Sequence, residues 1–146
     1  MYLGYQNGKI KFYTEQQLDK AFYNLDKVVE TQDEYILDGD EYVLNDEAYQ
    51  EKKAQEEKER IAKLTCTKRV FALMLQELGI TYTQLKTLIS TNEQAQLEWD
   101  LCVELERANP LLDIMAGQMG ITSEQLDGLF RYANGEIELE DFKALV

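Results

Sequence analysis

A repeated pattern in the second half of the chain constrains its fold more than any other feature. Residues 79–89 read GITYTQLKTLI, and residues 120–130 read GITSEQLDGLF. In both copies a glycine can end one helix in the left-handed conformation. A threonine three residues before a glutamine can then form the capping box that begins the next helix. The apolar positions before the corner match at the same offset. The pattern therefore predicts two copies of a helix–corner–helix unit, residues 70–89 and 111–130.

Corners of this kind also occur in helix-turn-helix proteins, where basic side chains surround the helix that enters the DNA groove. Here the second helix of the first copy offers only Lys86, and that of the second copy offers the acidic Glu124 and Asp127. The whole chain has 15 basic and 28 acidic residues, which gives a net charge of −13. Because an acidic surface repels phosphate, we expect no nucleic-acid partner and interpret the repeat as a scaffold.

The residues that most enzymes need are missing or are not arranged for catalysis. The chain has no histidine, so hydrolysis by a serine or cysteine nucleophile with a histidine base is excluded. There is no phosphate-binding glycine loop or nucleotide motif. The acidic turn Asp38-Gly39-Asp40 and the segment YANGEIELEDF at 132–142 lack the ligand spacing of a calcium loop. We therefore predict no catalytic residue, no metal site and no cofactor, and a protein that is not an enzyme.

The two cysteines and the hydropathy of the chain indicate its compartment. Cys66 and Cys102 are isolated and lie in helical patterns, so we predict two reduced core thiols rather than a disulfide or a zinc site. No stretch has the length of a membrane span, and the N-terminus MYLGYQNGKI lacks the apolar core of a signal peptide. The expected location is a bacterial cytoplasm, with no membrane partner.

The first 45 residues are expected to form an antiparallel β unit made of two hairpins. Asn7-Gly8 is a strong signal for a type I′ turn, and it would place Leu3 opposite Phe12 and Tyr5 opposite Ile10, all four on one side of the ribbon. In the second hairpin, a turn at Gly39-Asp40 would set Leu37 against Tyr42 and Tyr35 against Leu44. Between the hairpins, residues 14–28 are compatible with either a short helix or a loop.

Residues 46–64 (DEAYQEKKAQEEKERIAKL) carry the clearest helical composition in the chain. Asn45 or Asp46 can cap the helix, and almost no apolar stripe precedes Ile61. We interpret this segment as a connector helix between the β unit and a helical unit. The alternative is the charged face of a single domain.

Residues 65–146 are predicted to be helical throughout, as an all-α bundle. Helices are expected to begin at Thr67, at Asn92 or Glu93, and at Asn109-Pro110, where proline at the first helical position costs no hydrogen bond. The spacing predicts that one of these helices faces the core with four residues: Leu97, Leu101, Cys102 and Leu105. The chain as a whole is thus expected to be α+β, with a β-hairpin unit at 1–45, a connector at 46–64 and a helical bundle at 65–146.

The candidate binding residues are aromatic, because tyrosine and tryptophan are enriched at protein interfaces. Nine tyrosines stand against five phenylalanines, and most of the tyrosines lie in the N-terminal third. Trp99 is either an interface anchor or a tryptophan at the core boundary. The candidates for partner binding are Tyr2, Tyr5, Tyr13, Tyr35, Tyr42, Tyr49 and Trp99.

The layout resembles small accessory proteins of phages and prophages in low-GC Gram-positive and related bacteria, often encoded beside tail-fibre genes. The resemblance rests on a tyrosine-rich β segment (MYLGYQNGKIKFYT and DEYILDGDEYVL), a charged helix ending in KERIAKLTCTKRVF, and the segment RANPLLDIMAGQMGITSEQLDGLF. It is also similar in layout to tail-fibre assembly proteins. The resemblance implies a non-catalytic role in a phage tail or its assembly. It implies a fibre or baseplate protein as partner, a homo-oligomer, and location in the virion tail after synthesis in the host cytoplasm.

The charge supports a second hypothesis, in which the chain is a phage-encoded inhibitor of a host defence or nucleic-acid enzyme. A net charge of −13 suits a protein that imitates DNA against a basic groove.

Overall fold

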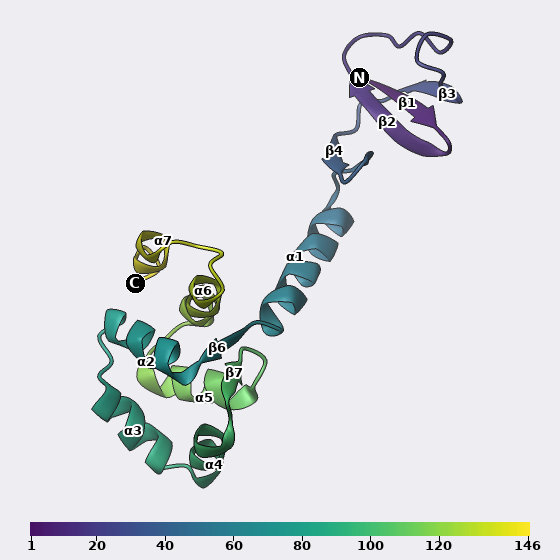
Figure 1. Cartoon of the computed structure of the whole chain (residues 1–146). Coiled ribbons are helices and arrows are strands. Elements are labelled where there is room, and N and C mark those ends of the chain that lie inside the picture. The colour runs from purple at the N-terminus through teal and green to yellow at the C-terminus, as the bar shows by residue number, and fades with distance from the viewer. The chain divides into compact units, whose positions relative to one another are not determined.

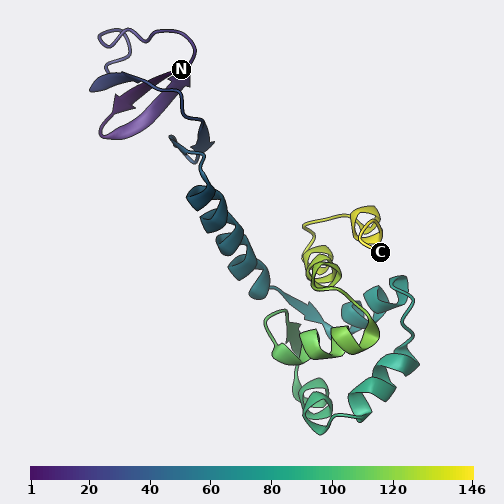
Figure 2. The ribbon, with the colours of Figure 1, turned by 180° about the vertical axis from the view of Figure 1, so that it is seen from behind.

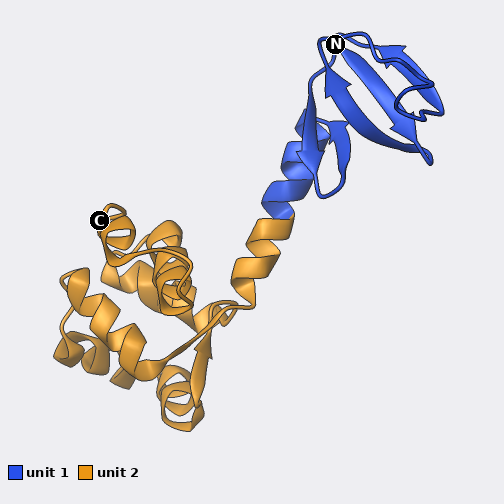
Figure 3. Cartoon of the chain, turned by 45° about the horizontal axis from the view of Figure 1, so that its top comes forward, with its two compact units in different colours: residues 1–55 blue, residues 56–146 orange.

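The computed structural model describes residues 1–146 and confirms a mixed α+β fold. The chain forms two compact units, residues 1–55 and residues 56–146, which are coloured separately in Figure 3. The boundary falls inside helix α1 (Glu47–Ala62), so the first half of this helix belongs to unit 1 and the second half to unit 2. None of the side chains of α1 is buried.

Unit 1 contains a three-stranded antiparallel sheet with the strand order β2-β1-β3 (Figure 1). Strands β1 (Tyr2–Gln6) and β2 (Lys9–Thr14) form the first expected hairpin. Its turn has positive φ at both central residues, 53° at Asn7 and 75° at Gly8, as a type I′ turn requires. The prediction from the Asn-Gly pair is confirmed.

The register of this hairpin agrees with the prediction near the turn and departs from it farther away. Tyr5 lies opposite Ile10 as expected, but a β-bulge follows, so Leu3 pairs with Tyr13 instead of Phe12. The bulge adds one residue to β2 and turns Phe12 to the face of Gly4. A Cβ at Gly4 would lie 2.9 Å from Leu18 Cδ1 and 3.2 Å from Phe12 Cβ. Glycine is therefore needed here for close packing.

The third strand, β3 (Lys27–Glu30), was not predicted from the sequence. It pairs antiparallel with β1, so Leu3 faces Val29 on one side and Tyr13 on the other. The segment before β3 is a series of turns that buries Leu25, which corresponds to the loop alternative for this stretch.

The second hairpin has the predicted register. Strands β4 (Tyr35–Asp38) and β5 (Glu41–Leu44) pair with Leu37 opposite Tyr42 and Tyr35 opposite Leu44. Gly39 in the turn has a φ of 66°. Helix α1 begins directly after this hairpin, where the Asp46 carboxylate accepts a hydrogen bond from the Tyr49 amide at 2.8 Å.

Unit 2 is not helical throughout, and the prediction of an all-α bundle is wrong at two places. Strand β6 (Thr65–Thr67) pairs antiparallel with β7 (Glu104–Glu106), and Cys66 lies opposite Leu105. Both of these side chains are buried in the core. Alternation of apolar and polar residues over only three positions is too short to be distinguished from a helix end in the sequence.

Six helices complete unit 2 around one hydrophobic core (Figures 1 and 2). They are α2 (Lys68–Glu77), α3 (Tyr82–Ser90), α4 (Glu93–Leu101), α5 (Pro110–Met119), α6 (Ser123–Ala133) and α7 (Leu139–Lys143). The predicted N-caps are present at Thr67, Asn92 and Asn109, and Pro110 occupies the first turn of α5. Asn134 ends α6.

The two predicted corners have the same geometry. Gly79 and Gly120 adopt φ values of 82° and 73°, and the next residue donates its amide back across the corner in both copies: Ile80 N to Leu75 O at 2.9 Å, and Ile121 N to Ala116 O at 2.8 Å. Full capping boxes follow at Thr81 with Gln84 and at Thr122 with Gln125. The buried positions also correspond at an offset of 41 residues: Phe71 with Leu112, Met74 with Met115, Leu75 with Ala116, Leu85 with Leu126, and Ile89 with Phe130.

The prediction for the core face of α4 is wrong. Leu97 and Leu101 are exposed, although Leu105 is buried and Cys102 packs against the core. Instead, α4 turns Ala95 and Trp99 inward, four residues apart on one face. The small side chain of Ala95 permits a close approach, and this orientation leaves the two leucines on the opposite side.

Arg107 is the only charged residue buried in the chain. It lies directly after β7, and its guanidinium donates hydrogen bonds to Asp127 at 2.6 Å, to Asp113 at 3.0 Å and to Ser123 Oγ at 3.0 Å. A buried guanidinium needs such partners to offset the loss of hydration. Arg107 therefore ties β7 to the first turns of both α5 and α6.

The matching capping boxes give a test of the repeat. Thr81→Ala and Thr122→Ala each remove a side-chain acceptor for a helix amide, and we expect each to lower the free energy of unfolding by about 1 kcal/mol. The double variant should lose close to the sum, because the two caps serve different helices. Urea unfolding followed by circular dichroism measures this. Thr81→Ser and Thr122→Ser keep the acceptor and should unfold close to wild type; equal losses in the serine variants would contradict a capping role.

Candidate interaction surfaces

Three of the candidate tyrosines come together in unit 1. The Tyr13 ring lies 5.6 Å from that of Tyr35 and 5.9 Å from that of Tyr42, in tilted arrangements. The Tyr13 hydroxyl donates to the Asp33 carbonyl at 3.1 Å. Partial burial, followed by the charges of Tyr5 and Asp33, raises the pKa of Tyr35. All three rings are half-buried, so a large part of their surface is already used to pack the second hairpin on β2.

Ion pairs hold the tip of the same hairpin beside β2. Lys11 donates to the Asp40 carbonyl at 2.6 Å and to its carboxylate at 2.7 Å, and Lys9 lies 3.7 Å from both Asp40 and Glu41. The hydrogen bond from Lys11, its charge and that of Lys9 lower the pKa of Asp40. These contacts fix the position of the tyrosine cluster within unit 1.

The other three candidate tyrosines of unit 1, Tyr2, Tyr5 and Tyr49, make different contacts. Tyr2 occupies the end of β1 opposite Thr14, and the Tyr5 ring lies 4.1 Å from Lys27 Nζ. On α1, Tyr49 contributes with Lys53 to lowering the pKa of Asp38; the hydrogen bond from Lys53, 2.9 Å away, is the larger cause. Of these three, Tyr5 lies near enough to Tyr35 for its charge to raise the pKa of that side chain.

An exposed aromatic side chain in unit 1 was not among the residues predicted from the sequence. Phe22 is 79% exposed and packs edge-to-face on Tyr23, 4.8 Å between ring centres. Tyr23 in turn lies 5.1 Å from Phe12. Both residues lie in the turns before β3, where no periodic pattern indicated which side chains face the core.

Trp99 lies at the boundary of the unit 2 core. Its ring is half-buried, 6.3 Å from that of Phe71 and 5.7 Å from Lys68 Nζ, and Lys68 also donates to the Trp99 carbonyl. The outer side of the ring borders an open surface with Arg69, Leu73 and Tyr82. Both of the roles considered for Trp99 therefore have a structural basis, since the ring packs on the core and also borders an open surface.

Three strongly exposed apolar side chains of unit 2 lie on and just after α4. Leu97 is 57% exposed, Leu101 is 74% exposed and Val103 is 87% exposed; we call these three residues the α4 stripe. Leu97 and Leu101 are four residues apart and share one face of the helix. The exposed acidic residues Asp100 and Glu104 flank the stripe. Exposed apolar side chains that share one face, as Leu97 and Leu101 do, are typical of protein-binding surfaces.

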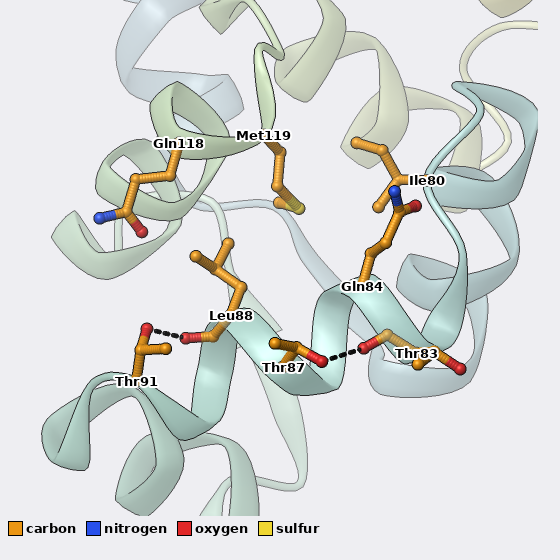
Figure 4. A pocket seen from close by; sticks show the side chains of 8 residues that line it. All are labelled: Ile80, Thr83, Gln84, Thr87, Leu88, Thr91, Gln118 and Met119. Carbon is orange, nitrogen blue, oxygen red and sulfur yellow. Dashed lines mark hydrogen bonds between the residues drawn. The ribbon is translucent and has the colours of Figure 1, made fainter.

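A groove of about 460 Å³ opens between α3 and the end of α5 (Figure 4). Leu88 on α3 points toward the end of α5, where Met119 and Gln118 lie, and the Gln84 side chain lies beside Ile80 at the corner between α2 and α3. The hydroxyl groups of Thr87 and Thr91 donate to the carbonyls of Thr83 and Leu88, so they are satisfied within α3. The lining carries no ionised side chain. The residues of the groove are Ile80, Thr83, Gln84, Thr87, Leu88, Thr91, Gln118 and Met119.

No group of three or more histidine, cysteine, aspartate or glutamate side chains is arranged to hold a metal ion. None of the helices is both long and apolar enough to cross a membrane. No family model, curated protein or solved structure matches the chain.

The two cysteines allow the α4 region to be probed by chemistry. Burial raises the pKa of Cys66 to about 12, whereas Cys102 is partly exposed at the end of α4. Because the thiolate is the reactive form, iodoacetamide at pH 8 should modify Cys102 at least about tenfold faster than Cys66 in the folded protein. Peptide mass spectrometry over time gives both rates. Cys102→Ser should abolish the fast phase and Cys66→Ser should preserve it; a fast phase that survives in Cys102→Ser would contradict the burial of Cys66.

Proposed function

We propose that this chain is a non-catalytic accessory protein of a phage tail or of tail assembly, and that it acts by binding other proteins. The α4 stripe is the observation that supports a binding role most directly. Its three apolar side chains are mostly exposed to water. Burying two or three of them against a partner would contribute a few kcal/mol to the free energy of binding.

The surroundings of the stripe define the chemistry of its partner. Asp100 and Glu104 stand next to Leu101 and Val103 in the chain, and all four side chains are exposed. A matching surface therefore combines an apolar patch with lysine or arginine at its rim. The specific assignment to a tail-fibre or baseplate protein rests on the resemblance in sequence layout, and a homo-oligomer is the arrangement expected with it.

Purification from phage-producing cells tests the proposal. The affinity-tagged chain should recover a tail-fibre or baseplate protein, identified by mass spectrometry, and should be an oligomer by size-exclusion chromatography with light scattering. Leu97→Gln with Leu101→Gln should reduce recovery by more than about tenfold, because the loss of two buried leucines exceeds 1.4 kcal/mol. Ile114→Gln is the matched control, since Ile114 is also exposed and apolar in unit 2 but lies on α5. A monomeric wild type that recovers no tail protein would overturn the proposal.

The acidity of the chain favours a second candidate function, inhibition of a host defence or nucleic-acid enzyme. Acidic residues of unit 2 such as Asp100, Glu104 and Glu106 are exposed, and the net charge of −13 would attract a basic groove over a long range.

In this case a host nuclease should bind the chain tightly at low salt and lose affinity steeply as salt rises. Asp100→Asn with Glu104→Gln should weaken the binding and flatten its salt dependence, whereas Glu124→Gln on α6 is the control. Isothermal titration at several salt concentrations measures both effects. Detection of the chain in purified virions by mass spectrometry would favour the tail role and count against this one.

A further inference from the structure

We propose that the groove between α3 and α5 is a docking site for a short amphipathic helix of a partner protein. The occupant carries a large aromatic side chain and, three residues later, a small one. This site is distinct from the α4 stripe and does not depend on the proposed function.

In the second copy of the repeat, the helix face that corresponds to the groove is covered. The position of Thr87 on α3 corresponds to Gly128 on α6, and that of Gln84 corresponds to Gln125. Helix α7 lies on this face of α6 (Figures 1 and 2). A Cβ at Gly128 would lie 2.4 Å from Leu145 Cδ1 and 3.5 Å from a ring carbon of Phe142. The side chains that cover α6 are therefore an aromatic and an aliphatic residue three positions apart.

Two polar contacts to the C-terminal segment involve residues whose counterparts in the other copy line the open groove. Gln125 uses its side-chain oxygen for the capping box and donates its Nε2 to the Leu145 carbonyl at 2.9 Å. On the other wall, Lys143 lies 3.7 Å from Glu77 at the end of α2. Glu77 corresponds to Gln118 in the second copy, and Gln118 lines the open groove at the end of α5. Both walls of the open groove thus have counterparts in contact with α7.

The open groove has the same side-chain amide donor that the covered face uses, the Nε2 of the capping-box glutamine. Gln84 likewise gives its side-chain oxygen to the Thr81 amide at 2.8 Å, and no hydrogen bond within the chain engages its Nε2. This amide can donate to a free carbonyl at the end of a docked helix, as Gln125 does for Leu145. Leu88 is half-buried and lines the groove, whereas its counterpart Leu129 is fully buried, so α3 leaves apolar surface exposed at a position where α6 leaves none.

The differences between the two faces predict what the occupant must look like. Thr87 has a side chain where Gly128 has none, so the residue in the place of Leu145 must be small. Thr91 stands where Tyr132 approaches the Phe142 ring at 6.4 Å, so there is more room for the aromatic residue. Gln118 in place of Glu77 removes the need for a lysine. A second copy of this chain is a poor occupant, because its Phe142 is fully buried in its own core.

A pair of synthetic peptides and the purified full-length chain test this inference. The first peptide copies residues 136–146 with Lys143→Gln and Leu145→Ala, and the second copies them unchanged. Two-dimensional NMR should show the first peptide shifting the amides of Thr83, Thr87, Leu88 and Thr91, with at least about tenfold higher affinity than the second, a difference near 1.4 kcal/mol.

Variants of the groove make the test specific. Thr87→Gly should improve binding of the unchanged peptide, because it restores the space that Leu145 occupies on α6. Thr87→Arg should weaken binding of the first peptide more than about tenfold, while Gln94→Arg, on the exposed side of α4, should leave it unchanged. The proposal is overturned if the first peptide causes no shifts at millimolar concentration. It is also overturned if the peptide shifts the amide signals of Gly128 and Tyr132 but not that of Thr87, because the peptide would then be displacing α7 from α6.

Discussion

The architecture of unit 2 depends on one backbone hydrogen bond that occurs twice. In each corner the amide of an isoleucine donates to the carbonyl five residues earlier, across a glycine in the left-handed conformation. The accepting carbonyl also receives a second amide of the corner, from Leu78 in the first copy and from Gly120 in the second, and the additional bond fixes the direction in which the chain departs. The capping box that follows begins the next helix within two residues. Since both corners have nearly equal dihedral angles, the buried positions before and after them also correspond.

The departures from this repeat, rather than the repeat itself, produce the open surfaces of unit 2. Both second helices are followed by a further helix, α4 after α3 and α7 after α6, but the two pack differently. Phe142 of α7 is fully buried and covers the face of α6 that contains Gly128. In contrast, α4 contributes Ala95 and Trp99 to the core, and the face of α3 that contains Thr87 stays open. Gly128 leaves space for Leu145 on α6, whereas Thr87 has a side chain at the corresponding position of α3.

Local signals in the sequence predicted most of the elements, because each rests on a few neighbouring residues. Asn7-Gly8 fixes a turn whose backbone few other pairs can adopt, and Thr81 with Gln84 marks a helix start through contacts three residues apart. The errors occur where a distant contact decides. The bulge in β2 places Phe12 opposite Gly4, where Leu18 and Leu25 also pack, and β6 pairs with β7, almost forty residues later in the chain. Neither partner is visible in a short window of sequence.

The candidate binding residues illustrate why surfaces are harder to predict than elements. Aromatic composition selected Tyr13, Tyr35 and Tyr42, but the same large rings that favour interfaces also fill the small space between the second hairpin and β2. Amphipathic spacing, for its part, assigned Leu97 and Leu101 to the core. A helix of nine residues with apolar side chains on more than one face can turn either face inward, and the choice depends on the shape of the surface that it meets. Ala95 and Trp99 fit beside Phe71, so Leu97 and Leu101 remain in solvent although their spacing indicated burial.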